Sequence, residues 1–515
     1  MRNHRWSLVV AALLAIGCKS DPKDPKTWIG QLDGDHDQQV RALRELKALK
    51  SADAVPALIP LLKDVALRED VAAVLEAIGD KRAVGPLAQA LDTSVGAGTD
   101  KATQKANNAN TRIAAALAAL GDQAAVPSLR QLLKSRDNYV RIAAIDALGT
   151  LAAKEAADDL IAIADDEATP PLLIKKCIVA LGQMGDVKAL PLFERMLVLE
   201  KGGVSFLSET SYALFQLGDA AVQPLMDLLE DKDAAYVKWA KDHDRAMAGV
   251  YAKAALVLGD LADPRAAPAL LGKLKYTDDN TDPDKNFFMT SYVRAFAADS
   301  LGHIRARAAA PQIAALLSGD AEQATEDLDY FAGRATVSLG DRSVAGKLLA
   351  AAAKKGEWKL RTYLITTAAT LADLKDRPAL EKLAVGEEDD HVKFISAQVL
   401  KLAAADECKT TVACWQGKLK DANAGVRERA AWELGWAGSV DSLPSLVAAA
   451  KDDALDARLA AFRAIDFIAH TPAGREAAKR VAPALAAQLA GERGKVQYVK
   501  VDEDLKRLVT ALQRI

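Results

Sequence analysis

Histidine and cysteine are the residues best suited to metal or nucleophilic chemistry, and both are scarce in this 515-residue chain. The six histidines are His4, His36, His243, His303, His391 and His470. No two of them are four residues apart, as metal ligands on one helix face would be, and none is followed by glutamate. The chain also shows no Ser-His-Asp or Cys-His motif, no phosphate-binding glycine loop and no dinucleotide fingerprint. We therefore expect no catalytic residues, no metal site and no cofactor.

One acidic run offers oxygen ligands at alternate positions. Residues Asp278–Asp284 resemble the first half of a calcium-binding EF-hand loop. However, Pro283 occupies the place of the essential glycine, and Met289 occupies the place of the closing glutamate. We therefore expect a solvated turn here rather than a calcium site.

The cysteines point to three different roles. Cys408 and Cys414 bracket five residues at a predicted turn between two helices, where the chain could bring the two thiols together. We predict a disulfide between them, with two free thiols as the alternative, because disulfides persist outside the cytosol. Cys177 lies in an apolar helical run and is expected to be a small buried side chain.

The fourth cysteine, Cys18, follows an export signal. Two arginines precede the unbroken apolar run Leu8–Ile16, which is too short for a bilayer core that needs about 20 residues. The segment Leu14–Cys18 resembles a bacterial lipobox, with Ala15 standing where leucine is usual. The resemblance implies that residues 1–17 form a signal peptide and that Cys18 is the lipidation site. Plain secretion and an uncleaved chain are the alternatives.

The predicted signal peptide and lipidation site predict that the protein is located in the bacterial cell envelope. Residues 18–26 would be the lipidated cysteine and a polar tether, holding the protein on the periplasmic or outer-membrane face, with the lipid bilayer as one partner. A formal net charge of −3 argues against nucleic acid as another partner.

The rest of the chain repeats one unit: an alanine-rich helix, a tight turn, a second helix and a loop. Gly-Asp often marks the turn, as at Gly121-Asp122, and Val-Arg often opens the first helix, as at Val140-Arg141. The second helices start near positions that are mostly proline: Pro56, Pro86, Pro127, Asp158, Pro191, Pro224, Pro268, Pro311, Gly346, Pro378, Cys414, Pro444 and Pro483.

These units resemble the HEAT repeat, particularly the HEAT-like variety of phycobilin lyases. The resemblance implies an all-α, right-handed α-solenoid of about thirteen stacked helix pairs over residues 27–515. It also implies that Asp137 and Arg141 link neighbouring repeats. It does not carry lyase activity with it, because a shared fold does not imply a shared function.

Three spacings between repeats are long. The extra residues form predicted loops near 92–110, 231–249 and 276–291, and the second of these is expected to contain a helical turn around Tyr236. All three follow a second helix and precede the next first helix, so a solenoid places them on one edge. They are either a binding side or tolerated surface loops.

An aromatic pair stands out in the C-terminal part. Trp432 and Trp436 share one helical face, which is typical of core residues, although an exposed pair could anchor a partner. Stacked helix pairs expose a long ribbon without a deep cavity. We therefore expect a non-enzymatic, membrane-anchored scaffold, adaptor or assembly factor that binds a protein or peptide. The alternatives are a structural spacer and an envelope enzyme with an unrecognised site.

Overall fold

Long and short helices alternate through the computed structural model, which describes residues 21–318, 326–354, 357–469 and 472–493. The predicted all-α repeat architecture is confirmed, and each predicted start of a second helix falls inside a short helix. Cys18 and the predicted signal peptide lie outside the described residues. Within the described ranges, no helix combines the length and apolar character that a membrane span requires.

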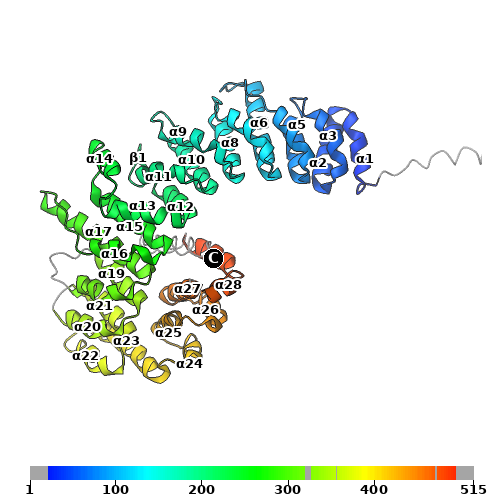
Figure 1. Ribbon diagram of the computed structural model, residues 1–515. Helices are drawn as coiled ribbons and strands as arrows, with labels where there is room; N and C mark the ends of the chain where they lie inside the picture. The colour runs from blue at the N-terminus through cyan, green and yellow to red at the C-terminus, as the bar shows by residue number, and fades with distance from the viewer. Residues whose placement is uncertain (1–20, 319–325, 355–356, 470–471, 494–515) are drawn as a thin grey trace, which may run out of the picture. The chain divides into compact units, whose positions relative to one another are not determined.

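The chain divides into two compact units (Figure 1). The first unit runs to Phe193 and includes Glu200–Leu217; the second comprises Glu194–Leu199 and the chain from Gly218 onward. In each unit the first helices of successive repeats pack side by side, as α8 does with α10 and α25 with α27. The bounds of the elements follow for each unit separately.

After α1 (Pro25–Ile29), the first helices of the first unit are α2 (His36–Leu49), α4 (Arg68–Ile78), α6 (Lys101–Leu120), α8 (Asn138–Thr150), α10 (Pro171–Met184) and α12 (Leu207–Leu217). The second helices are α3 (Val55–Leu61), α5 (Val84–Gln89), α7 (Val126–Leu132), α9 (Ala157–Asp165) and α11 (Leu190–Met196), whose last three residues belong to the second unit. An unpredicted antiparallel hairpin joins β1 (Glu200–Lys201) to β2 (Val204–Ser205).

The first helices of the second unit are α15 (Met247–Leu261), α17 (Pro283–His303), α19 (Glu326–Leu339), α21 (Trp358–Leu371), α23 (Asp389–Cys408), α25 (Ala424–Ala437) and α27 (Leu455–Ala469). The second helices are α13 (Asp219–Leu229), α16 (Ala267–Lys273), α18 (Ala310–Ser318), α20 (Ala345–Ala352), α22 (Arg377–Lys382), α24 (Val412–Lys418), α26 (Leu443–Ala449) and α29 (Ala482–Arg493). Two further helices are α14 (Ala234–Asp242) and α28 (Pro472–Ala478).

The Gly-Asp signal has a direct structural explanation. Gly121 ends α6 in the left-handed conformation, with φ of 66°, which glycine adopts without a side-chain penalty. The carboxylate of Asp122 then accepts a hydrogen bond from the backbone N–H of Ala124, at 3.0 Å, and starts a single 3₁₀ turn that leads into α7. This local chemistry sets where each second helix begins.

Small residues let successive first helices approach closely. A Cβ atom on Gly182 of α10 would lie 2.6 Å from the Cα atom of Ala213 in α12, and one on Gly435 of α25 would lie 2.8 Å from the Cα atom of Ala464 in α27. The high alanine content of the first helices follows from this packing, because larger side chains would force the helices apart.

The second unit also closes on itself through residues far apart in the sequence. Nη1 of Arg463 in α27 donates to Nε2 of His303 in α17 at 2.9 Å. The indole N–H of Trp436 in α25 donates to the carbonyl of Val337 in α19 at 3.1 Å. The helices α17–α27 therefore follow one another around a turn (Figure 1) whose ends are held together.

Two predicted loops are shorter than expected. Residues 101–110 belong to α6, because Asp100 caps the helix by accepting a hydrogen bond from the backbone N–H of Thr103, at 2.9 Å. Residues 283–291 belong to α17, which Pro283 begins and Asp282 caps. In the insertion at 231–249, the predicted helical turn is the nine-residue helix α14. Polar composition had concealed these helical segments.

Candidate functional site

We call the loops that lead from each second helix to the next first helix the inter-repeat edge. In the first unit this edge exposes Val65, Tyr139 and Leu172, whose exposed fractions are 47%, 77% and 54%. Tyr139 and Leu172 are each in the first turn of a long helix, α8 and α10, where side chains point away from the packed faces. Exposed aromatic and aliphatic side chains of this kind can serve as anchors when a partner buries them.

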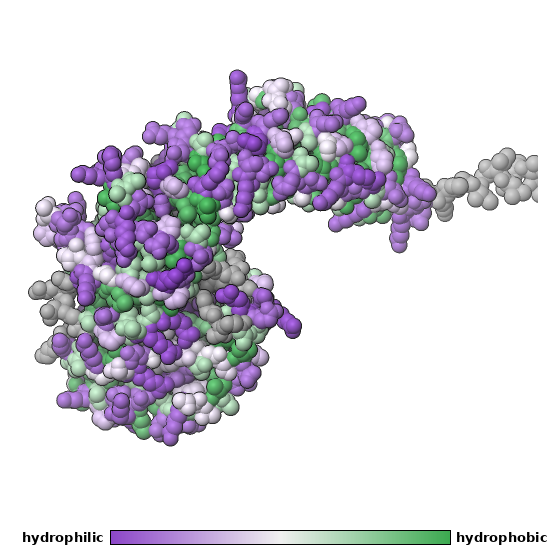
Figure 2. Space-filling model, viewed as in Figure 1, coloured by the Kyte–Doolittle hydropathy of each residue, from purple (hydrophilic) through white to green (hydrophobic). Residues whose placement is uncertain are grey.

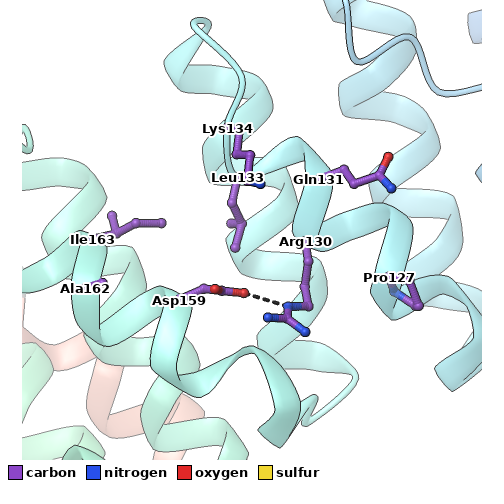
Figure 3. Close-up of a pocket in the computed structure, with 8 residues that line it drawn as sticks. All are labelled: Pro127, Arg130, Gln131, Leu133, Lys134, Asp159, Ala162 and Ile163. Carbon is purple, nitrogen blue, oxygen red and sulfur yellow. Dashed lines mark hydrogen bonds and ion pairs between the residues drawn. The ribbon is translucent and has the colours of Figure 1, made fainter.

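A groove between α7 and α9 opens beside this edge (Figure 3). It has a volume of about 400 Å³, and Leu133, Ala162 and Ile163 supply its apolar part. Nε of Arg130 donates to Oδ2 of Asp159 at 2.6 Å across the groove. Both side chains are well exposed, so this ion pair contributes about 0–1 kcal/mol and can rearrange around a bound segment.

The same groove recurs two repeats earlier, between α3 and α5. Its volume is about 480 Å³, and Leu62 and Lys63 line it as Leu133 and Lys134 line the later groove. Arg68 adds a second cation there, and its Nε atom donates to the carbonyl of Leu62 at 2.8 Å. On the face that Figure 2 shows, hydrophilic and hydrophobic residues are interspersed along these repeats. The two grooves therefore present similar apolar and basic groups at corresponding positions of their repeats.

The insertion at 92–110 is held down by buried asparagines that the sequence analysis did not single out. Asn110 bonds to both backbone groups of Asp92, accepting at 2.9 Å and donating at 2.8 Å. Asn107 donates to the carbonyl of Gly96 at 3.1 Å and to a carboxylate oxygen of Asp137 at 3.2 Å. Asp137 thus links neighbouring repeats, as the resemblance implied, but its described side-chain partner is Asn107 and not Arg141.

Aromatic residues hold the other two insertions. The hydroxyl of Tyr236 in α14 donates to the carbonyl of Glu194 at 3.1 Å. The hydroxyl of Tyr251 in α15 donates to Asp231 at 2.7 Å, and Nζ of Lys273 lies 3.2 Å from the centre of the Tyr251 ring. Burial raises the pKa of the Glu194 carboxyl to about 7. These insertions pack against the repeats. The side chain of Phe288, in the third insertion, is 51% exposed.

The acidic run Asp278–Asp284 uses its oxygen atoms locally. Asp278 accepts from the hydroxyl of Tyr276 at 2.6 Å and from the backbone N–H of Asn280 at 2.9 Å, and Asp282 caps α17. These are the bonds of a polar turn. Across the described residues, no three or more histidine, cysteine, aspartate or glutamate side chains are placed to hold a metal ion.

The structure joins Cys408, the last residue of α23, to Cys414 in α24 by a disulfide, with the Cα atoms 5.3 Å apart. Cys177 is fully buried and free, as predicted. Burial raises the pKa of its thiol to about 12, so it is unreactive as a nucleophile. Of the tryptophan pair, Trp432 is 6% exposed, and Trp436 is half-buried and contacts α19. The core interpretation of the pair is therefore correct.

Five segments of the chain match models of one repeat class. Residues 99–173 and 378–466 match the model described as HEAT repeats. Residues 67–93, 250–275 and 293–319 match the model described as PBS lyase HEAT-like repeat. These matched segments are HEAT repeats. No curated protein matches the chain.

Several solved HEAT-repeat structures are similar in fold. Yeast importin-β has 10% identity and a TM-score of 0.40, and the match covers 95% of this chain and 76% of that chain. The same importin, Kap95p, bound to RanGDP has 13% identity and a TM-score of 0.37. That match covers 96% of this chain and 66% of that chain. The phycocyanin lyase complex CpcE–CpcF from Nostoc has 20% identity and a TM-score of 0.24, covering 61% of this chain and 94% of that chain. At these identities the likeness concerns the fold alone.

Proposed function

We propose that this protein is a non-catalytic scaffold that binds a polypeptide along the inter-repeat edge of its first unit. The observation that carries the proposal is the recurrence of exposed hydrophobic residues, Val65, Tyr139 and Leu172, on the edge that also receives the first insertion. The grooves beside α3 and α7 add apolar floors with lysine or arginine at their rims. An extended segment with apolar and acidic residues matches this surface.

We further propose that the scaffold works in the bacterial cell envelope, anchored in a bilayer through acylated Cys18. The support is the sequence of the N-terminus: a short apolar run, the lipobox-like Leu14–Cys18 and a polar stretch with two prolines. Anchoring would confine the protein to a membrane surface and raise the local concentration of anything that it holds.

Site-specific photo-crosslinking in the native host tests the binding edge. A photoreactive residue at Tyr139 or Leu172 should give a discrete crosslinked species. The matched control is Val187, which is 53% exposed but lies in the turn between the two helices of one repeat. Equal crosslinking at all three positions, or none at Tyr139 and Leu172, would contradict the proposal and favour a spacer.

The intact mass of the protein purified from host membranes tests the anchor. We expect a mass that lacks residues 1–17 and carries acyl chains. Cys18→Ser should keep the unprocessed mass and release the protein from the lipidated fraction. An unlipidated, full-length wild-type chain in the soluble fraction would overturn the envelope placement while leaving the crosslinking result intact.

A further inference from the structure

Within the second unit, the first helices α19, α21, α23, α25 and α27 line a partly open cavity of about 340 Å³. Its volume lies in the range of pockets that hold small organic molecules. The sequence analysis expected a ribbon without a deep cavity. In this unit, the contacts of α25 with α19 and of α27 with α17 bring the helices around a partly open cavity that the repeat pattern did not predict.

Aromatic rings from four different helices line the cavity: Tyr330, Tyr363, Phe394 and Trp432. The rings of Tyr330 and Tyr363 meet edge to face with their centres 6.2 Å apart. Trp432 is fixed by its contact with Phe467, at 6.1 Å between ring centres. Aromatic faces carry partial negative charge and attract organic cations.

Two carboxylates also line the cavity, Glu428 from α25 and Asp456 from α27. Oε2 of Glu428 accepts from Nζ of the buried Lys401 at 3.0 Å. Asp456 is accessible from the cavity, and it has no hydrogen bond or ion pair with the residues that the structure describes. Asp456 is also exposed to solvent, so it lies at the mouth of the pocket, where a carboxylate partly surrounded by protein attracts a cation more strongly than one in bulk water does.

The cavity's two arginines lie toward its other end. Arg463 and Asp456 are seven residues apart in α27, so their positions differ by about 10 Å along the helix axis. Arg463 bonds to His303, and Nε of Arg334 bonds to a carboxylate oxygen of Asp299 at 3.1 Å. The guanidinium groups are therefore held in one network, while the acidic end presents Asp456 to the open space.

We propose that this cavity binds a small organic amine, with Asp456 and Glu428 contacting the ammonium group and the rings of Phe394 and Trp432 contacting the apolar body. The chemistry required of the ligand is a primary or quaternary ammonium group on a compact apolar or aromatic frame. This site is separate from the inter-repeat edge of the first unit, so its test is independent of the scaffold proposal.

Titration calorimetry on the full chain tests the site with three matched probes: benzylamine, benzyl alcohol and benzoate. We expect benzylamine to bind and the two probes without an ammonium group to bind at least about tenfold more weakly. Binding of benzoate in preference to benzylamine, or no binding of benzylamine or benzyltrimethylammonium at millimolar concentration, would overturn the proposal.

Variants then assign the binding to the cavity. Asp456→Asn should weaken benzylamine binding by about ten- to a hundredfold, because it removes the charge and keeps the shape. Trp432→Leu should weaken it by a similar factor, and circular dichroism would confirm that each variant is folded. Asp406→Asn, at an exposed position of α23, is the control and should bind as the wild type does. Unchanged binding by folded Asp456→Asn would also overturn the proposal.

Discussion

Side-chain contacts reach different distances along the chain in the two units. In the first unit, Lys176 pairs with Asp146 of the preceding repeat, 30 positions away. In the second unit, Arg463 reaches His303, 160 positions away. Where only neighbouring repeats are in contact, the free energy of unfolding is approximately a sum of repeat and interface contributions. Contacts across a closed turn also couple repeats that are not neighbours in the sequence. One repeat type thus builds both an edge of inter-repeat loops and a partly open cavity.

Among the variants considered, replacement of Arg429 in the second unit should cause the largest loss in the free energy of unfolding. Its fully buried guanidinium donates to the carbonyls of Ala369 and Ala372, at 2.9 and 2.7 Å, and to Glu433. Arg429→Met leaves these buried acceptors without a donor, and we expect a loss of about 3–5 kcal/mol in the free energy of unfolding.

Urea unfolding followed by circular dichroism measures this loss, because both units are helical, and the fluorescence of Trp415, Trp432 and Trp436 follows the second unit separately. The control is Arg130→Met in the first unit, which removes an exposed ion pair and should cost about 0–1 kcal/mol. Similar losses for the two variants would show that the closing contacts add nothing beyond surface pairs.

The pH dependence of stability provides a second comparison. Burial raises the pKa of Glu194, at the start of the second unit, from 4.5 to about 7. Because the folded protein disfavours the ionised form, stability should fall as the pH rises from about 4.5 to 7, by at most about 3 kcal/mol. Glu194→Gln should flatten this dependence between pH 5 and 8. Glu200→Gln, at an exposed position, should not.

The disulfide should stabilise the second unit by about 2 kcal/mol, the value expected for so short a loop. Reduction should lower the melting temperature of the wild type and add two hydrogens to its mass. The double variant Cys408→Ser/Cys414→Ser should melt at the temperature of the reduced protein and be insensitive to reductant. A wild type that is equally insensitive would indicate two free thiols.

The smallest expected difference in stability is between alanine variants of two glycines. Gly340 and Gly121 both have φ of 66°, but a Cβ atom on Gly340 would lie 3.0 Å from the indole nitrogen of Trp436, whereas one on Gly121 meets nothing within 4 Å. Both alanine variants carry the left-handed backbone penalty, of about 1 kcal/mol. Gly340→Ala should cost about 1 kcal/mol more, because it presses on the closing contact. Equal losses would mean that the indole moves aside freely.

Much of the fold follows from local signals in the sequence. Gly-Asp turns, helix-starting prolines and alanine-rich first helices are short-range patterns, and they predicted the repeats along the described chain. The helix at residues 101–110 was missed because buried asparagines, Asn107 and Asn110, resemble loop residues in composition. Their burial is offset by hydrogen bonds to the carbonyl groups of Asp92 and Gly96. These bonds form only when the fold brings that segment beside the helix, so the sequence alone does not reveal them.

The candidate sites were less predictable. The insertions drew attention to the inter-repeat edge, but the sequence did not point to Tyr139 or Leu172, because exposure depends on which helix face is packed. The cavity was missed entirely. Arg429 and Glu433 have the four-residue spacing of an ordinary surface ion pair, yet they are 0% and 7% exposed. Their long-range partners are the end of α21 and Arg342, which lie far back along the chain, and no local pattern carries that information.

The closing bond between Arg463 and His303 has an evolutionary consequence. A repeat could be gained or lost within the first unit, and the remaining neighbours could still pair with one another. In the second unit, an added or deleted repeat between α17 and α27 would move Arg463 away from His303 and Trp436 away from Val337. Both hydrogen bonds would then be lost. The length of this segment is therefore fixed by geometry, and sequence drift there should proceed by substitution rather than by duplication.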